Sequence, residues 1–244
     1  MAASPSLGTD DFVRQLRPMT VDLYISLQLV YDVRNEFNKM ILFAHTIVDP
    51  DPTPDHDRLF EIAEGQAGYF TAAQARTVGF RGPLLSYHVR SGQFERTRPG
   101  VYRLKRFPAS SHEDLFAAVL GVGPKAVISH DSALALYDLS DLLPADTHLT
   151  VPRTASRRRT GLRLHTNRLQ PGDVTRYAGL PITTAARTIA DVASAGLADE
   201  LVLQAIREAL QRGLATPDDL RAAAAARGGR ALRLVEQALE AHTA

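Results

Sequence analysis

The chain has 244 residues, of which 45% are hydrophobic and 23% charged, a balance typical of a globular protein with a packed core rather than a disordered chain. It contains no cysteine, which excludes disulfides, thiolate metal sites and cysteine nucleophiles. The amino terminus lacks a basic, apolar signal, and the most apolar run, residues 40–48, is too short to span a bilayer. We therefore expect a cytoplasmic protein with no membrane partner.

The net charge of +1 is unevenly distributed along the chain. Residues 1–55 hold four basic and eight acidic side chains, whereas residues 56–110 hold nine basic and four acidic ones. Eight of these nine positive charges are arginine, whose planar guanidinium suits phosphate oxygens and guanine edges. The second segment is consistent with a nucleic-acid partner, and a solvated basic face accounts for its charge equally well.

Residues 1–55 are interpreted as an amino-terminal extension. Between Val21 and Ala44, apolar residues recur at a spacing of three to four, which predicts an amphipathic helix. Three prolines and two aspartates over residues 49–54 then interrupt regular structure. The extension is a partner-binding helix, a lid on the next domain or a product of an upstream start codon, and the pattern leaves these alternatives open.

Residues 56–108 have the element order of a winged helix-turn-helix domain. Thr71 and Gln74 form a capping box, and Pro83 suits the first turn of a helix. The three helices are expected at 56–64, 71–79 and 81–92, and two strands at 94–98 and 101–104, around the turn Pro99-Gly100. Three small helices also occur in protein-docking modules, so docking of a protein is the alternative to DNA binding.

In a winged helix-turn-helix domain, the third helix lies in the major groove and the hairpin contacts the flanking DNA backbone. We expect Leu85 and Val89, one turn apart, to face the core of the domain. The residues expected to read base edges are Arg81, at the entrance to the helix, and Ser86, Tyr87 and Arg90 on its outer side. The residues expected to contact phosphates lie on the wing and are Arg96, Arg98 and Arg103.

Residues 109–244 predict a small mixed α/β domain with a helical carboxy-terminal tail, which makes the whole chain α/β (α+β). Helices are expected at 112–121, 130–139, 183–195, 199–212, 216–227 and 229–241, and strands at 126–129, 147–151 and 161–166. The loop between the last two strands carries Arg157, Arg158 and Arg159. This run is either a solvated loop or a second contact, to DNA or to an acidic partner.

Side chains with catalytic potential do not form a convincing site in the sequence. The string from Ser129 to Ser132 contains hydrolase residue types, but neighbours at one helix start cannot converge on one substrate atom, so capping by Asp131 or Ser132 is the better interpretation. His148 and His165 lack the carboxylate cluster that a metal site would need. We expect no catalytic residue, no metal and no cofactor, and therefore no enzyme.

Several phrases between Leu59 and Leu239 resemble the AbiEi-type antitoxin family of type IV toxin–antitoxin systems. They are residues 69–75 (YFTAAQA), 98–103 (RPGVYR), 127–136 (VISHDSALAL), 149–153 (LTVPR) and 180–191 (LPITTAARTIAD). The resemblance implies a transcriptional repressor that binds inverted repeats in its own promoter and is encoded beside a nucleotidyltransferase-like toxin. It also implies that residues 109–244 form the antitoxin domain. The alternative function is a protein-interaction module that neutralises the toxin by direct binding.

Overall fold

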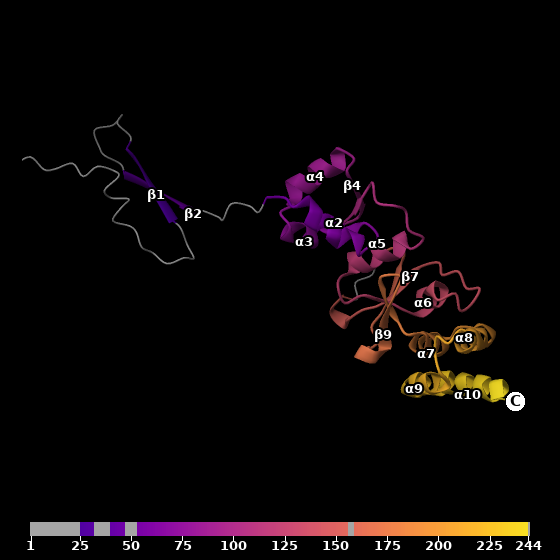
Figure 1. Ribbon diagram of the computed structural model, residues 1–244. Helices are drawn as coiled ribbons and strands as arrows, with labels where there is room; N and C mark the ends of the chain where they lie inside the picture. Colours follow the sequence, from indigo (N-terminus) through magenta and orange to yellow (C-terminus); the bar gives the residue numbers. More distant parts are fainter. Residues whose placement is uncertain (1–24, 32–39, 47–52, 156–158, 244) are drawn as a thin grey trace, which may run out of the picture. The chain divides into compact units, whose positions relative to one another are not determined.

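The computed structural model describes residues 25–31, 40–46, 53–155 and 159–243 of the chain. The chain divides into two compact units, Met1–Thr53 and Pro54–Ala244. Figure 1 shows the two units and labels their helices and several of their strands.

The first unit contains a β-hairpin where a helix was expected. β1 (Ile25–Tyr31) and β2 (Met40–Thr46) pair antiparallel along their whole length. The prediction of an amphipathic helix over residues 21–44 is therefore wrong wherever these residues are described. Ser26 and Gln28 alternate with apolar residues in β1. This alternation has a period of two residues, which favours a strand over a helix.

The second unit begins with the winged helix-turn-helix arrangement that the sequence predicts. Its elements are α2 (His56–Glu64), β3 (Tyr69–Thr71), α3 (Ala72–Thr77), α4 (Gly82–Arg90), β4 (Phe94–Arg98) and β5 (Val101–Leu104). The strands form an antiparallel sheet in the order β3-β5-β4, so β5 is its central strand. The β4–β5 hairpin is the wing, and β3 is a strand that the sequence analysis did not anticipate.

Local hydrogen bonds explain where the short helices begin. The Thr71 hydroxyl oxygen accepts from the backbone N–H of Gln74 at 3.1 Å, and the Gln74 amide oxygen accepts from the backbone N–H of Thr71 at 2.8 Å. This is the predicted capping box. Asp55 caps α2 by accepting from the backbone N–H of Arg58 at 2.9 Å, and Pro83 lies in the first turn of α4, where no N–H donor is needed.

Aromatic side chains fill the core of the winged-helix segment. Phe70 and Phe80 are fully buried, and Phe94 meets Phe70 edge-on with 5.2 Å between the ring centroids. Leu85 of α4 is buried in the same cluster, and Val89 is partly buried against it. The prediction that Leu85 and Val89 face the core is confirmed.

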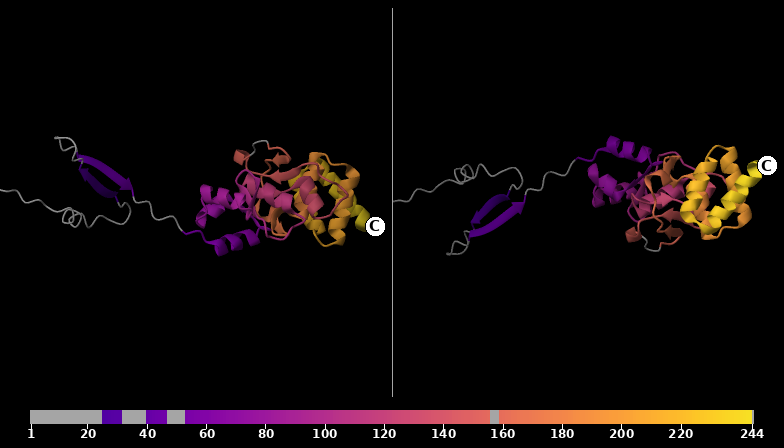
Figure 2. Two further views of the ribbon diagram at one scale, coloured as in Figure 1. Left: turned by 90° about the horizontal axis from the view of Figure 1, so that it is seen from above. Right: turned by 90° about the horizontal axis from the view of Figure 1, so that it is seen from below.

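The rest of the second unit is a mixed five-stranded sheet with helices packed against it (Figures 1 and 2). The strands are β6 (Val127–Ile128), β7 (Thr147–Thr150), β8 (Leu162–His165), β9 (Val174–Tyr177) and β10 (Leu180–Thr183), in the order β8-β7-β6-β10-β9. The helices are α5 (Glu113–Val122), α6 (His130–Leu136), α7 (Ala185–Ala195), α8 (Asp199–Gln211), α9 (Pro217–Arg227) and α10 (Gly229–Thr243). The mixed α/β class with a helical carboxy-terminal region is confirmed, and β9 and β10 are additional strands.

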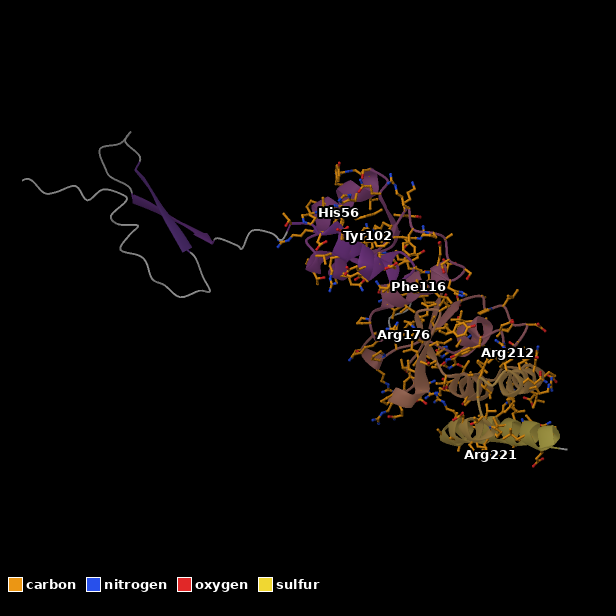
Figure 3. The ribbon with its side chains drawn as sticks, viewed as in Figure 1. His56, Tyr102, Phe116, Arg176, Arg212 and Arg221 are labelled. Atoms are coloured by element: carbon orange, nitrogen blue, oxygen red, sulfur yellow. The ribbon has the colours of Figure 1, made fainter. Side chains whose placement is uncertain are left out.

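α5 joins the two parts of the second unit. Phe116 of α5, labelled in Figure 3, stacks on Tyr69 of β3 with 6.4 Å between the ring centroids. Tyr69 and Val101 belong to the larger apolar cluster, which the carboxy-terminal helices and the five-stranded sheet also build. One face of the wing sheet therefore packs on the aromatic core of the winged-helix segment, and the other packs on α5.

Gly68, in the turn before β3, offers a test of this packing. Its φ is +85°, and a Cβ at this position would lie 2.6 Å from Cβ of Phe107. We expect Gly68→Ala to lower the free energy of unfolding by roughly 2–5 kcal/mol, from left-handed backbone strain and overpacking together. Denaturant unfolding measures the change.

Gly100→Ala is the matched control for this substitution. Gly100 has a similar φ of +75°, but a Cβ there would meet nothing within 4 Å. Only the backbone strain applies at this position, so the expected loss is about 1 kcal/mol. Equal losses at the two positions would contradict a tight approach of Phe107 to the turn.

Candidate nucleic-acid interface

The exposed residues of α4 lie along one side of the helix. Ser86, Tyr87 and Arg90 are exposed, and Tyr87 has 55% of its surface accessible to solvent. Leu85 and His88 are buried on the opposite side. The structure thus brings three predicted base-reading residues together on an outward-facing stripe. Their contact with bases stays a prediction.

His88 fixes the inner side of α4 and was not anticipated from the sequence. It is only 6% exposed, and its Nδ1 lies 2.7 Å from the side-chain oxygen of Gln93. Its ring also lies against Phe94, with 4.7 Å between the ring centroids. The position three residues after Leu85 is the signal that could have revealed it, because residues at this spacing share one side of a helix.

The residues at the amino-terminal end of α4 are exposed. Arg81 is the N-cap residue and is exposed, but its side chain makes no capping hydrogen bond. Gly82 and Pro83 follow it and are exposed as well. A Cβ added at Gly82 would meet nothing within 4 Å, so the first turn presents little bulk to an approaching surface.

The two arginines of β4 differ in their surroundings. Arg96 is exposed, whereas Arg98 is half-buried beyond a register shift in the pairing of β4 with β5. A Cβ on Gly121 would lie 3.5 Å from Cδ of Arg98, so the aliphatic stem of Arg98 lies against the end of α5. Both residues keep the wing positions that the sequence predicts, and their contact with phosphates stays a prediction.

Arg103 does not fit the predicted phosphate-contacting role. It is only 9% exposed, forms an ion pair with Glu113 at 2.8 Å, and donates to the carbonyl oxygens of Phe107 and Pro108 at 3.0 and 3.1 Å. Its guanidinium also lies over the Tyr69 ring, 5.8 Å from the centroid. Side chains alternate along a strand, and this position of β5 faces α5 rather than solvent. Arg103 is therefore a structural residue.

The arginine run between β7 and β8 is only partly described. Arg157 and Arg158 lie outside the described residues. Arg159 is exposed, and its guanidinium donates to the carbonyl oxygen of Gly121, in the last turn of α5. A cation there complements the negative end of the helix dipole. Because Arg98 also contacts Gly121, the end of this loop lies next to the wing.

Three histidines that are distant in the sequence meet beside α6. The rings of His130 and His165 stack with 3.5 Å between centroids and 8° between planes, and His148 lies 5.2 Å from His165. An imidazole nitrogen binds a metal ion through a lone pair that lies in the plane of its ring. Because the rings of His130 and His165 are stacked and nearly parallel, their lone pairs cannot point at the same ion. In the part of the chain that the structure describes, no three His, Cys, Asp or Glu residues are placed to hold a metal ion.

Side chains at the start of α6 bind the sheet rather than cap the helix. Ser129 is the N-cap residue without a capping hydrogen bond, and its hydroxyl oxygen accepts from Thr150 at 2.8 Å. Ser132 accepts from the backbone N–H of His148 at 2.8 Å. The interpretation of Asp131 or Ser132 as the cap is therefore wrong, because the N-cap position belongs to Ser129 and the buried Ser132 hydroxyl accepts from the backbone of β7 instead.

A second buried polar cluster joins α7 to its surroundings. Asp191 is 1% exposed and accepts from Nε of Arg187 at 3.0 Å and from the guanidinium of Arg227 in α9. Arg187 also forms an ion pair with Asp173 at 2.6 Å. Burial raises the pKa of Asp191, although the two guanidinium groups beside it act to lower it. The spacing of four between Arg187 and Asp191 is the signal in the sequence that indicates this pair.

The elements from α2 to β5 have the order of a winged helix-turn-helix domain. Residues 57–105, from α2 to the end of the wing, match the family model described as transcriptional regulator, AbiEi antitoxin. The resemblance to AbiEi antitoxins is confirmed for this segment, and the part of the resemblance that extends to Leu239 stays a prediction.

A solved structure is also similar to this chain. It is the RV2827C protein from Mycobacterium tuberculosis, with 12% sequence identity, a TM-score of 0.47 and coverage of 80% of each chain. No curated protein matches the sequence. Among the described residues, none of the helices is long and apolar enough to cross a membrane.

The histidine cluster predicts a dependence of stability on pH. Burial lowers the pKa of His165 to about 4 and that of His130 to about 2, and it lowers the pKa of His148 as well. Between about pH 6.5 and pH 4, the unfolded chain therefore binds protons at His130 and His165 that the folded chain does not bind. The free energy of unfolding should therefore decrease as the pH falls from about 6.5 to 4.

Denaturant unfolding at a series of pH values measures this decrease. His165→Asn removes one of the three groups, so the decrease should be shallower in this variant than in the wild-type protein. A free energy of unfolding that stays constant between pH 7 and pH 5 would contradict the burial of neutral histidines.

Proposed function

We propose that this protein is a DNA-binding transcriptional autorepressor that acts as the antitoxin of a type IV toxin–antitoxin pair with a nucleotidyltransferase toxin. The observation that carries the proposal is the exposed stripe of Ser86, Tyr87 and Arg90 on α4, within a segment that matches antitoxin regulators. Tyr87 has 55% of its surface accessible, so its ring and hydroxyl group are available to a bound partner.

In this proposal, the residues have two kinds of role. Ser86, Tyr87 and Arg90, with Arg81 at the entrance to α4, read base edges in the major groove of inverted repeats in the promoter of the protein's own gene. Arg96 and Arg98 on the wing contact phosphates, which set the position and the salt dependence of binding. Arg157, Arg158 and Arg159 are a further candidate contact, either to DNA or to an acidic partner.

The proposal divides the chain by function. Residues 1–55 are an extension without an assigned role, residues 56–108 bind DNA, and residues 109–244 form the antitoxin domain. The protein opposes the toxin by repressing the operon and carries out no reaction itself. Neutralisation by direct docking is the alternative. The amphipathic helix expected in the extension would favour a partner-binding role, but its described residues form a β-hairpin.

The salt dependence of DNA binding should distinguish Arg96, which is exposed, from Arg103, which is buried. Arg96→Ala should weaken binding to all duplexes alike and reduce the slope of log K against log salt concentration by about 0.9, because one phosphate contact is lost. Arg103→Ala should leave this slope unchanged and lower the free energy of unfolding, because Glu113 loses its partner. Fluorescence anisotropy at several salt concentrations measures the slopes, and denaturant unfolding measures the stability.

Arg90→Ala tests sequence-specific binding within the same set of variants. We expect a loss of about 1–3 kcal/mol on the promoter and a smaller loss on scrambled DNA. The proposal fails if the wild-type protein binds promoter and scrambled duplexes with equal affinity.

Co-purification tests how the protein opposes its toxin. If repression is the mechanism, the two proteins expressed together should not form a stable complex, and the antitoxin should still lower transcription of the toxin gene. Capture of the toxin by the tagged antitoxin, together with loss of toxicity when the promoter is replaced by a foreign one, would favour direct docking instead.

A further inference from the structure

The hydrogen-bonding groups on the outer side of α4 differ in what they offer to a base pair. Arg90 has only N–H donors. The hydroxyl group of Ser86, one turn earlier, lies 2.9 Å from the carbonyl oxygen of Gly82. A carbonyl oxygen cannot donate, so the hydroxyl proton occupies this bond and the Ser86 oxygen is left to accept. The exposed stripe therefore carries Arg90, which can only donate hydrogen bonds, and Ser86, whose oxygen can accept one.

The major groove distinguishes these two kinds of group. Guanine presents two acceptors, N7 and O6, which suit a guanidinium. Adenine and cytosine present an exocyclic amine, which needs an acceptor, whereas thymine presents an acceptor and a methyl group. Arg90 follows Ser86 by four positions, a rise of about 6 Å along the helix axis, which is close to two base-pair steps of about 3.4 Å.

Resting on the proposed function, we infer that α4 reads a guanine through Arg90 and, within two base pairs of it, an adenine or cytosine whose exocyclic amine donates to Oγ of Ser86. The serine side chain is short, so it reaches a base edge only if the helix approaches closely. Gly82 and Pro83 precede it and are exposed, and the empty space around Gly82 permits this approach. The buried Leu85 and His88 hold the opposite side of α4 in the core.

Ser86 also has an ordinary role, because serine in a helix often donates to the carbonyl four residues earlier. In that role, the hydroxyl group affects the helix alone, and its removal leaves base preference unchanged. The experiment must therefore follow base preference at individual positions rather than affinity on a single duplex.

The test uses the full-length protein and duplexes that it selects from a random pool. We expect the selected sites to share a guanine with an adenine or cytosine within two base pairs. Replacing this guanine by 7-deazaguanine, or replacing the amine-bearing base, should weaken binding of the wild-type protein by roughly 5- to 150-fold.

Ser86→Ala and Arg90→Ala should each lose one preference and keep the other. Ser86→Ala should tolerate loss of the amine but still require the guanine, and Arg90→Ala should show the reverse. Ser86→Thr keeps an acceptor and should keep both preferences. Arg96→Ala is the matched control, because loss of a wing arginine should weaken binding to every duplex without changing either preference.

The outcomes separate this inference from the function on which it rests. If selection enriches no sequence, the proposed function fails and the inference fails with it. If the wild-type protein selects a site but Ser86→Ala keeps the full preference for the amine-bearing base, or the site holds no such base near the guanine, the inference alone is overturned.

Discussion

The burial of Arg103 is the constraint on which the arrangement of the wing and α5 depends. β5 lies between β3 and β4, and α5 covers one of its faces, so a guanidinium on that face must find acceptors inside the protein. Glu113 and two backbone carbonyls provide them. A buried charge that loses its partners is strongly destabilising, so the wing sheet and α5 are restricted to one relative arrangement. The exposed arginines of α4 and β4 thus project from a fixed framework.

Most of the winged-helix segment could be predicted because its signals are local in the chain. The capping box at Thr71, the proline at the start of α4 and the turn Pro99-Gly100 each specify an element through neighbouring residues. The outward direction of Ser86 and Arg90 follows from the helical period once Leu85 is assigned to the core. The exposed positions of α4 could be predicted without information from distant parts of the chain.

The features that the sequence did not predict depend on contacts between residues far apart in the chain, or lie in segments whose apolar pattern fits both a helix and a strand. An arginine on a strand is exposed or buried according to what covers the strand, and Glu113 on α5 decides this for Arg103. The three histidines meet only because β7 and β8 pair in parallel, which places His165 opposite Thr150, next to the start of α6. In β1, a helical and an alternating pattern overlap, and pairing with β2 favours the alternating one.

The link between Arg227 and Asp191 has a consequence for the alignment of the carboxy-terminal helices. α9 buries only Leu220 and Ala224, and its alanine run offers no large side chain to interlock with a neighbour. Within the alanine run, sliding by one turn, about 5.4 Å, would exchange one alanine for another, so the fully buried Leu220 is the apolar side chain that opposes such a shift. The buried carboxylate accepts the guanidinium at a single longitudinal position, so charge pairing adds to the burial of Leu220 in selecting the register of α9 against α7.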